Sequence, residues 1–498
     1  MDSSPTGDLL KDPEPAQVGR LASRGVLFLI LRYGGLQLVG LAANIVLSRR
    51  LSPASFGVYA LTLALLVLMT WVSDFGLGAA LLQKRAAVRP EDLRTVFTIQ
   101  QSLLGALAIV GLLLSPWIAG LYHLGAAGPT FVQAMVVGGL LASIRTVPTV
   151  VLERRLLYGR LTMIEVVDVL SFQITAVVLA VAGLGPWSFI WAVLVSKTAG
   201  TALAYLLARW RPGLGLDRAA LGGLLWFALP FQLTWLTYLF RDYLIPILGG
   251  VLVGTIAVGY LNWALALSGV PGQMAQVVGR VSFPSLSRMQ HDPTAFGRAL
   301  EASIRALFLV AVPVEVTLLA LAPWLIHFVF SDKWLPALLP LYLLALQWAA
   351  ANLTTPLVSA LNAVGRVRET LVLNAAWTGA TLILAWALVR FEGFVGIAVA
   401  FLVTRLVATA AAWIMVRRVA PVRIWSAIRL PLAASVVTGA AGYAVTRLVP
   451  GDLLELVLTA LSMGVLYCAL LWLAEGRRLR GDIGLLITLL RPGPAAPG

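Results

Sequence analysis

The chain has 498 residues, of which 60% are hydrophobic and 12% charged, and its mean hydropathy of +0.91 excludes an ordinary soluble globular domain. Its net charge of +15 and pI near 10.6 would suggest a nucleic-acid partner if the chain were soluble. Here the basic residues lie in short loops between apolar runs, so membrane topology and attraction to anionic lipid headgroups explain the charge, and we expect no nucleic-acid partner.

Residues 1–20 are polar and lack an apolar stretch, so we expect a disordered segment rather than a signal peptide. After them, fourteen stretches of about 20 apolar residues are each long enough to cross a bilayer as a helix. The predicted spans are 25–47, 56–80, 96–121, 131–152, 161–183, 187–208, 221–248, 254–277, 306–329, 337–360, 370–389, 394–416, 430–446 and 453–474. No connection between them is long enough for a soluble domain, so the function is expected to reside among the helices.

The basic residues alternate between connections. Twenty-seven of the 37 Lys and Arg residues lie in the N-terminal segment and in the segments on the same side of the membrane. The opposite side carries five, which are Arg49, Arg50, Lys333, Arg390 and Arg447. By the positive-inside rule, this bias places the Arg-rich connections and both termini in the cytoplasm, with an even number of spans.

A short internal repeat suggests two related halves. ASFGVYALTLA (54–64) follows the first span, and TIAVGYLNWALA (255–266) follows the seventh. Both place a Gly and a Tyr at the start of an even-numbered span, as in transporters built from parallel repeats. Recurrence of Gly and aromatic residues at membrane interfaces is the alternative explanation.

Residues that would indicate an enzyme or a metal site are missing from the sequence. Cys468 is the single cysteine, so an intramolecular disulfide is excluded. The three histidines are isolated, and no phosphate-cradling Gly-rich motif is present. We therefore expect no catalytic residues, no metal and no cofactor apart from a coupling ion, either H+ or Na+.

Five basic residues lie inside the predicted spans, where a charge is costly and usually functional. They are Arg32, Arg145, Lys197, Arg241 and Arg405. Bases in a polar cavity are suited to an anionic headgroup, and Arg can donate two hydrogen bonds to one phosphate. The alternative for each base is a buried ion pair that holds two helices together.

Five acidic residues also lie in or beside the spans. They are Asp74, Glu165, Asp168, Asp242 and Glu315. Glu165 and Asp168 share a helix face because they are three residues apart. Together they could bind a proton or Na+, or they could form an ion pair with Arg145 or Lys197. Asp74 is expected to make a structural polar contact.

Four segments, in order, resemble the polysaccharide transporter family, the Wzx-like lipid-linked oligosaccharide flippases of the multidrug/oligosaccharidyl-lipid/polysaccharide flippase superfamily. They are SRRLSPASFGVYAL (48–61) with SDFGLGAALLQKR (73–85), FRDYLIPILGG (240–250) with VGYLNWALAL (258–267), FPSLSRMQHDPTAFGRAL (283–300) and SDKWLPALLPLYLLAL (331–346). The chain departs from the family where Asp242 is followed by YLIPILGG, which lacks the basic residue that often follows this aspartate.

The resemblance implies an all-α membrane protein with about fourteen helices. Its expected parts are a disordered cytoplasmic N-terminus (1–20), an N-lobe (21–220), a C-lobe (221–420), helices thirteen and fourteen (421–475) and a cytoplasmic tail (476–498). The two six-helix lobes would surround a central cavity. Spans one and seven border that cavity in the superfamily, so Arg32 and Arg241 are the first candidates for headgroup binding.

The implied activity is movement of an undecaprenyl-pyrophosphate-linked glycan from the cytoplasmic to the outer leaflet by alternating access. The implied setting is the bacterial inner membrane. A monomer is expected, with the lipid-linked glycan, membrane lipids, and a polymerase and glycosyltransferases of the same pathway as partners. The alternatives are a multidrug antiporter coupled to H+ or Na+, a glycosyltransferase or polymerase, and a scaffold that does not transport.

The predicted topology can be tested with accessible tags. A tag inserted at Gly393 should be labelled from outside intact cells, whereas one at Gly365 should be labelled only after permeabilisation, because they flank one predicted span. The reverse pattern would contradict the assigned orientation.

Overall fold

The computed structural model describes residues 34–84, 88–217, 221–222, 232, 243 and 245–490, with the side chains of 273–285 and 477–490 excepted. Within this part of the chain all regular structure is helical, and no strand occurs. The predicted all-α fold class is therefore confirmed.

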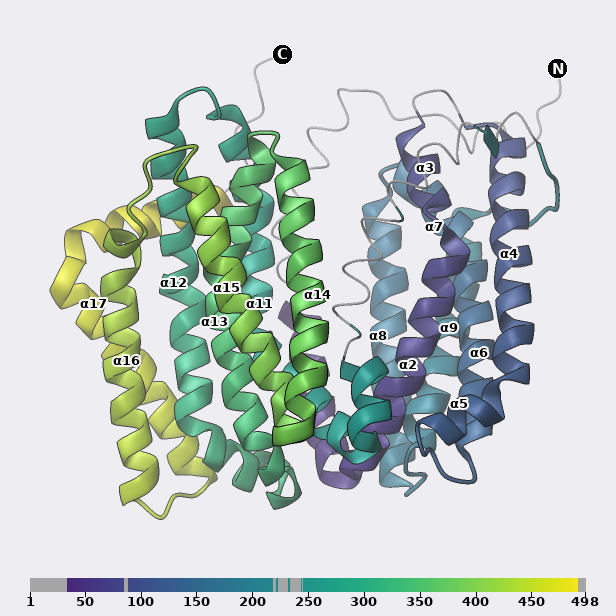
Figure 1. The fold of residues 1–498 in the computed structure, drawn as a ribbon, viewed down its shortest axis with the longest axis horizontal. Helices are drawn as coiled ribbons and strands as arrows, with labels where there is room; N and C mark the ends of the chain where they lie inside the picture. The colour runs from purple at the N-terminus through teal and green to yellow at the C-terminus, as the bar shows by residue number, and fades with distance from the viewer. Residues whose placement is uncertain are drawn as a thin grey trace. The chain divides into compact units, whose positions relative to one another are not determined.

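The described helices divide into two compact units, each drawn in Figure 1 as a bundle of roughly parallel and antiparallel helices. The N-unit ends at Leu239, and the C-unit holds the later elements, with Gly254–Ile256 excepted. The N-unit elements are α2 (Pro53–Asp74), α3 (Leu77–Gln83), α4 (Pro90–Leu113), α5 (Ser115–Leu121), α6 (Gly128–Ile144), α7 (Thr146–Arg154), α8 (Tyr158–Val181) and α9 (Trp187–Ala208). The C-unit elements are the π-helical η2 (Ile245–Gly249), α11 (Gly250–Arg288), α12 (Pro293–Trp324), the π-helical η3 (Leu325–Phe330), the 3-10 helix η4 (Asp332–Ala337), α13 (Leu338–Ala363), α14 (Val367–Glu392), α15 (Val395–Val416), α16 (Ile424–Leu448) and α17 (Leu453–Leu490).

Twelve candidate membrane spans occur among the described residues, and they correspond to twelve of the fourteen predicted spans. The other two predicted spans, 25–47 and 221–248, lie partly or mostly outside the described residues, although 34–50 is helical. The protein is a multi-pass membrane protein, and the total of fourteen spans stays a prediction.

Several helices begin at a capping residue followed by proline. Ser52 accepts a hydrogen bond from the Ser55 backbone N–H before Pro53 starts α2. Asp292 accepts bonds from two backbone N–H groups of the first turn before Pro293 starts α12. Such side chains satisfy backbone donors that have no helical partner, and proline suits the first helical position.

Two helices extend beyond the predicted spans. The span predicted at 306–329 lies within a helix that already begins at Pro293, because the Asp292–Pro293 capping signal precedes the apolar run. The segment predicted as a cytoplasmic tail from 476 is helical as far as Leu490. Backbone angles at Glu475 are non-helical (φ −144°, ψ 36°), so α17 bends there, as its yellow end shows in Figure 1.

Three prolines in membrane-spanning segments lack the N–H that could bond to the carbonyl four residues earlier. Tyr205 Oη on α9 donates to the Ile144 carbonyl (2.9 Å), which precedes Pro148 by four residues. In the C-unit, Tyr467 Oη on α17 donates to the Leu309 carbonyl (3.1 Å), four residues before Pro313. The third freed carbonyl, four residues before Pro431, accepts from an arginine described below. At these three positions a side chain from another helix contacts the carbonyl that the proline leaves without a helical partner.

The internal repeat recurs as equivalent contacts in the two units. Tyr59 on α2 stacks on Phe189 of α9, with ring centroids 4.5 Å apart. In the C-unit, Tyr260 on α11 stacks on Phe394, the residue before α15, at 6.0 Å. Each repeated tyrosine therefore joins the corresponding pair of helices, which supports two related halves.

Replacing Tyr467 with Phe should lower the stability of the C-unit by about 1 kcal/mol, because the Leu309 carbonyl would be left without a partner in an apolar region. Thermal unfolding of the purified protein measures the loss. In a Pro313→Ala background the helix itself can satisfy that carbonyl, so Tyr467→Phe should then cost much less. An equal cost in both backgrounds would show that the hydroxyl does not compensate for the proline.

Candidate functional site

Arg145 and Asp168 form an ion pair inside the N-unit. Arg145 lies at the joint between α6 and α7, within a predicted membrane span, and Asp168 lies in the middle of α8. Arg145 Nη1 donates to Asp168 Oδ2, and both side chains keep part of their surface exposed, 24% and 14% respectively. The ion pair therefore connects the joint between α6 and α7 with α8.

A second base lies beside the same carboxylate. Lys197 Nζ on α9 is 3.8 Å from Asp168 Oδ2, beyond hydrogen-bond distance, and its side chain is 23% exposed. Two cations thus share one carboxylate, so the group carries one net positive charge when all three are ionised. We call Arg145, Asp168 and Lys197 the N-unit cluster.

Gly200 on α9 makes the N-unit cluster sterically possible. A Cβ built at Gly200 would overlap Asp168 Oδ1 and come within 2.7 Å of Arg145 Nη1. Ser196, one turn earlier, donates to the Asp168 backbone carbonyl at 2.9 Å. The absence of a side chain at Gly200 therefore leaves room for an ion pair between neighbouring helices.

Arg405, a predicted site residue in the C-unit, has different partners from those of Arg145. The guanidinium of Arg405 on α15 lies 4.0 Å from the ring centroid of Trp377 on α14. With its oxygen turned toward Arg405, the Gln347 amide on α13 accepts hydrogen bonds from Nε (3.0 Å) and Nη2 (2.8 Å). A cation–π contact and a neutral amide contact Arg405, whereas a carboxylate contacts Arg145.

Two of the predicted acids make polar contacts with amide groups, and of the two Glu315 is buried whereas Asp74 is half-buried. Asp74, at the end of α2, accepts from Gln100 Nε2 (2.6 Å) and from the backbone N–H groups of Gly76 and Gly78. Its carboxylate therefore spans the break between α2 and α3, where Phe75 and Gly76 have left-handed backbone angles. Glu315 on α12 accepts from Asn352 Nδ2 on α13 at 3.0 Å.

Of the remaining predicted site residues, one lies within the described part of the chain and three lie outside it. Glu165 is exposed on α8, one turn from Asp168. Arg32, Arg241 and Asp242 lie outside the described residues, so their predicted roles stay predictions.

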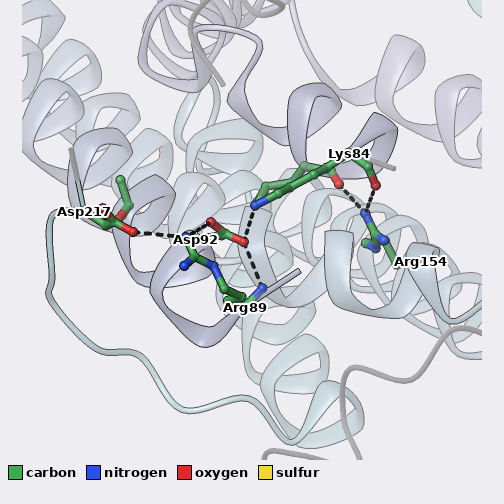
Figure 2. Close-up of polar contacts among 7 residues, drawn as sticks. Lys84, Arg89, Asp92, Arg154 and Asp217 are labelled. Carbon is green, nitrogen blue, oxygen red and sulfur yellow. Dashed lines mark hydrogen bonds and ion pairs between the residues drawn. The ribbon is translucent and has the colours of Figure 1, made fainter. Parts of the chain in front are cut away.

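A polar network that the sequence did not predict lies at one end of the N-unit (Figure 2). Asp92, whose side chain is fully buried, accepts from Lys84 Nζ (2.6 Å) and from the Arg89 backbone N–H (2.8 Å). Arg89 also reaches Asp217 at 3.1 Å, and Arg154 donates to the Lys84 carbonyl at 3.0 Å. These bases were assigned to topology alone, yet they also connect α4, α7 and the segment after α9. The helix-start pattern Arg89–Pro90–Glu91–Asp92 is the feature of the sequence that could have indicated this network.

A buried ion pair in the C-unit was also missed. Arg305 on α12 donates to Glu475 at the bend of α17, and its Nη1 is 3.4 Å from the Ala427 carbonyl, four residues before Pro431. Its side chain is only 4% exposed. Both partners had been placed in or beside connecting segments because the spans were drawn too short.

A sequence model of the family described as "Polysaccharide biosynthesis protein" matches residues 46–339, which is more than half of the chain. The chain belongs to this family. The resemblance to the polysaccharide transporters of the multidrug/oligosaccharidyl-lipid/polysaccharide superfamily is thereby confirmed.

Two curated relatives are similar over long stretches. The teichuronic acid biosynthesis protein TuaB of Bacillus subtilis (strain 168) is 28% identical over 300 residues, covering 59% of this chain and 61% of TuaB. The chain thus matches less than two thirds of TuaB. The lipopolysaccharide biosynthesis protein WzxC of Escherichia coli (strain K12) is 24% identical, covering 74% of this chain and 76% of WzxC.

Solved structures confirm the fold of this family member. The inward closed structure of the lipid II flippase MurJ has a TM-score of 0.77 and 12% identity, covering 91% of this chain and all of MurJ. An inward-facing multidrug resistance transporter of the MATE family has a TM-score of 0.60 and 16% identity, covering 79% of this chain and 96% of that structure. At such identities the likeness concerns the fold alone.

Gly200→Ala should disrupt the N-unit cluster, because the new Cβ cannot coexist with the Asp168 carboxylate in its present position. We expect a loss of about 1–3 kcal/mol in thermal stability. Gly379→Ala is the matched control, since no atom lies within 4 Å of a Cβ built there in α14. Equal melting temperatures for the two variants would contradict the proposed steric role of Gly200.

Proposed function

We propose that this protein is a flippase that moves a lipid-linked oligosaccharide or polysaccharide repeat unit from the cytoplasmic to the outer leaflet by alternating access. The observation that carries the proposal is the N-unit cluster, in which two bases share one carboxylate inside membrane helices. Membership of the polysaccharide biosynthesis family and the names of TuaB and WzxC support a glycan as cargo.

The N-unit cluster is suited to an anionic headgroup. A phosphate exposed to hydrocarbon would cost many kcal/mol, so the path must supply cations. Arg145 neutralises Asp168, while Lys197 lies too far from it for a hydrogen bond. Lys197 can therefore donate its protons to a phosphate without breaking the Arg145–Asp168 pair.

Further bases complete the proposal. Arg405 presents a guanidinium held between Trp377 and Gln347, which orients it for contact with a second anionic or hydroxyl group. Arg32 and Arg241 remain proposed headgroup contacts. The proposed carrier lipid is undecaprenyl pyrophosphate, and the proposed partners are the polymerase and glycosyltransferases that use the same glycan.

We further propose that the protein acts as a monomer in the bacterial inner membrane, with both termini cytoplasmic, and that transport is coupled to H+ or Na+. We propose no catalytic role for the chain. The connections on the predicted outer side are short and charge-poor, which supports a transporter over a glycosyltransferase or polymerase, since such an enzyme would need catalytic residues in outer loops.

A multidrug antiporter is the second candidate, because the fold is also similar to a MATE transporter. The net positive charge of the N-unit cluster favours an anionic cargo over the cationic drugs that an acidic cavity would bind. Binding of a cationic dye and of a lipid-linked glycan by the purified protein distinguishes the two candidates.

Lys197→Gln should reduce surface glycan about ten- to a hundredfold, as expected for the loss of one charge-assisted hydrogen bond of about 1.5–3 kcal/mol. Protein abundance should stay near normal, because the ion pair between Arg145 and Asp168 is retained. Surface glycan is measured in cells that depend on this chain for export, and Lys197→Arg should retain most activity.

Arg298→Gln is the matched control, since Arg298 is an exposed base on α12. Arg32→Ala and Arg241→Ala should behave like Lys197→Gln if they also bind the headgroup. Disappearance of these variants from the membrane would instead assign the bases a structural role. Normal export by Lys197→Gln would overturn the assignment of the N-unit cluster.

A further inference from the structure

A carboxyl group and an amide face each other in the interior of the C-unit. Glu315 on α12 is 1% exposed, and Asn352 on α13 is 0% exposed. Asn352 Nδ2 donates to Glu315 Oε1 at 3.0 Å. The other two oxygens of this pair, Glu315 Oε2 and Asn352 Oδ1, are buried without a hydrogen-bond partner among the described residues.

An ionised carboxylate in this place would be poorly compensated. One amide N–H would be its single polar partner in the described part of the chain, and burial of an unpaired charge costs several kcal/mol. A proton on Oε2 removes the charge and turns that oxygen into a donor. The oxygen of the same amide is an acceptor without a partner, so one proton satisfies both orphaned atoms through a reciprocal acid–amide pair.

We propose that Glu315, paired with Asn352, is a proton-binding site of the C-unit and supplies the coupling proton for transport. This inference rests on the proposed function for its role in transport, but the binding of the proton stands on the geometry alone. The proton enters from water on one side of the membrane and leaves to water on the other, and no other bond forms or breaks.

A proton fits this site better than Na+. A metal ion of this kind prefers several oxygen ligands, as hard cations do. The described residues offer two orphaned oxygens here, and they contain no cluster of three or more His, Cys, Asp or Glu side chains. A proton needs one donor position and one acceptor.

The elements packed against α12 are α13, α16, α17 and η3. The α13 helix carries no charged residue, and Glu315 makes no described electrostatic interaction with a charged group. Within the described side chains, the titratable and charged groups of these elements are Tyr342 on α13, Arg429, Tyr443 and Arg447 on α16, Glu455, Tyr467, Cys468 and Glu475 on α17 and His327 on η3. Glu475 pairs with Arg305, Arg447 contacts Tyr443, and His327 contacts Asp332.

The position of Glu315 explains how its charge could move helices. It follows Pro313 by two residues, where α12 lacks one helical hydrogen bond and Tyr467 of α17 contacts the freed carbonyl. Loss of the proton would leave two buried acceptor oxygens, Glu315 Oε2 and Asn352 Oδ1, without a donor between α12 and α13. That uncompensated burial would favour separation of the helices at a point where α12 is already able to bend.

The binding of the proton is tested by infrared spectroscopy of the full-length purified protein in lipid nanodiscs. The wild type should show the C=O stretch of a protonated carboxyl at neutral pH, and Glu315→Gln should remove it. Asn352→Leu should shift the band, because the amide partner is lost. Glu455→Gln, which alters an acid in the first turn of α17, should leave the band unchanged.

The coupling role is tested in proteoliposomes with a fluorescent lipid-linked glycan. An inward or outward pH gradient should change the wild-type flipping rate, and Glu315→Gln should flip at a rate that no longer responds to the gradient. If neither the wild type nor any variant flips the glycan but the carboxyl band is present, the proposed function is overturned and the proton site stands.

Other outcomes would overturn the proton site itself. A neutral-pH spectrum in which Glu315→Gln removes no carboxyl band would show that Glu315 is ionised. Thermal stabilisation by Na+ in the wild type, lost in Glu315→Gln, would show a sodium site instead. The Asn352→Leu variant keeps the first test informative if Glu315→Gln fails to fold, because an unchanged band would exclude the acid–amide pair.

Discussion

The structure depends on the requirement that every backbone polar group inside the membrane has a partner. Prolines violate this requirement, since each removes one helical hydrogen bond. At Pro148, Pro313 and Pro431 a side chain from another helix contacts the carbonyl four residues earlier. The side chains are Tyr205 in the N-unit and Tyr467 and Arg305 in the C-unit. These contacts allow helices to bend at defined points while remaining attached to their neighbours, which is the property a rocking transporter needs.

Charged groups in the apolar interior obey the same requirement. Asp168 is held by Arg145 beside Lys197, and the contact exists because Gly200 leaves the space. The corresponding region of the C-unit uses an amide and an indole around Arg405. The two units therefore share a fold plan, visible in the equivalent tyrosine contacts, but have diverged in the chemistry of their interiors.

Much of the fold could be predicted from the sequence. Apolar length and loop charge identified the spans because the membrane imposes length and polarity locally on each segment. The helices differ from the predicted spans at their ends, where α12 begins after Asp292, earlier than hydropathy indicates, and α17 continues beyond Glu475. There helices extend past the apolar region, and capping and side-chain pairing determine where they begin and bend.

The sequence by itself determined that this is a polytopic helical membrane protein, which family it resembles, and which charged residues lie within its helices. Only the tertiary structure decided which of those charges meet. Arg305 pairs with Glu475, 170 residues away, and Glu315 meets Asn352 on the next helix, 37 residues away. Hydropathy depends on each segment alone, whereas the partner of a buried charge depends on the rotation and packing of whole helices, which no local pattern encodes.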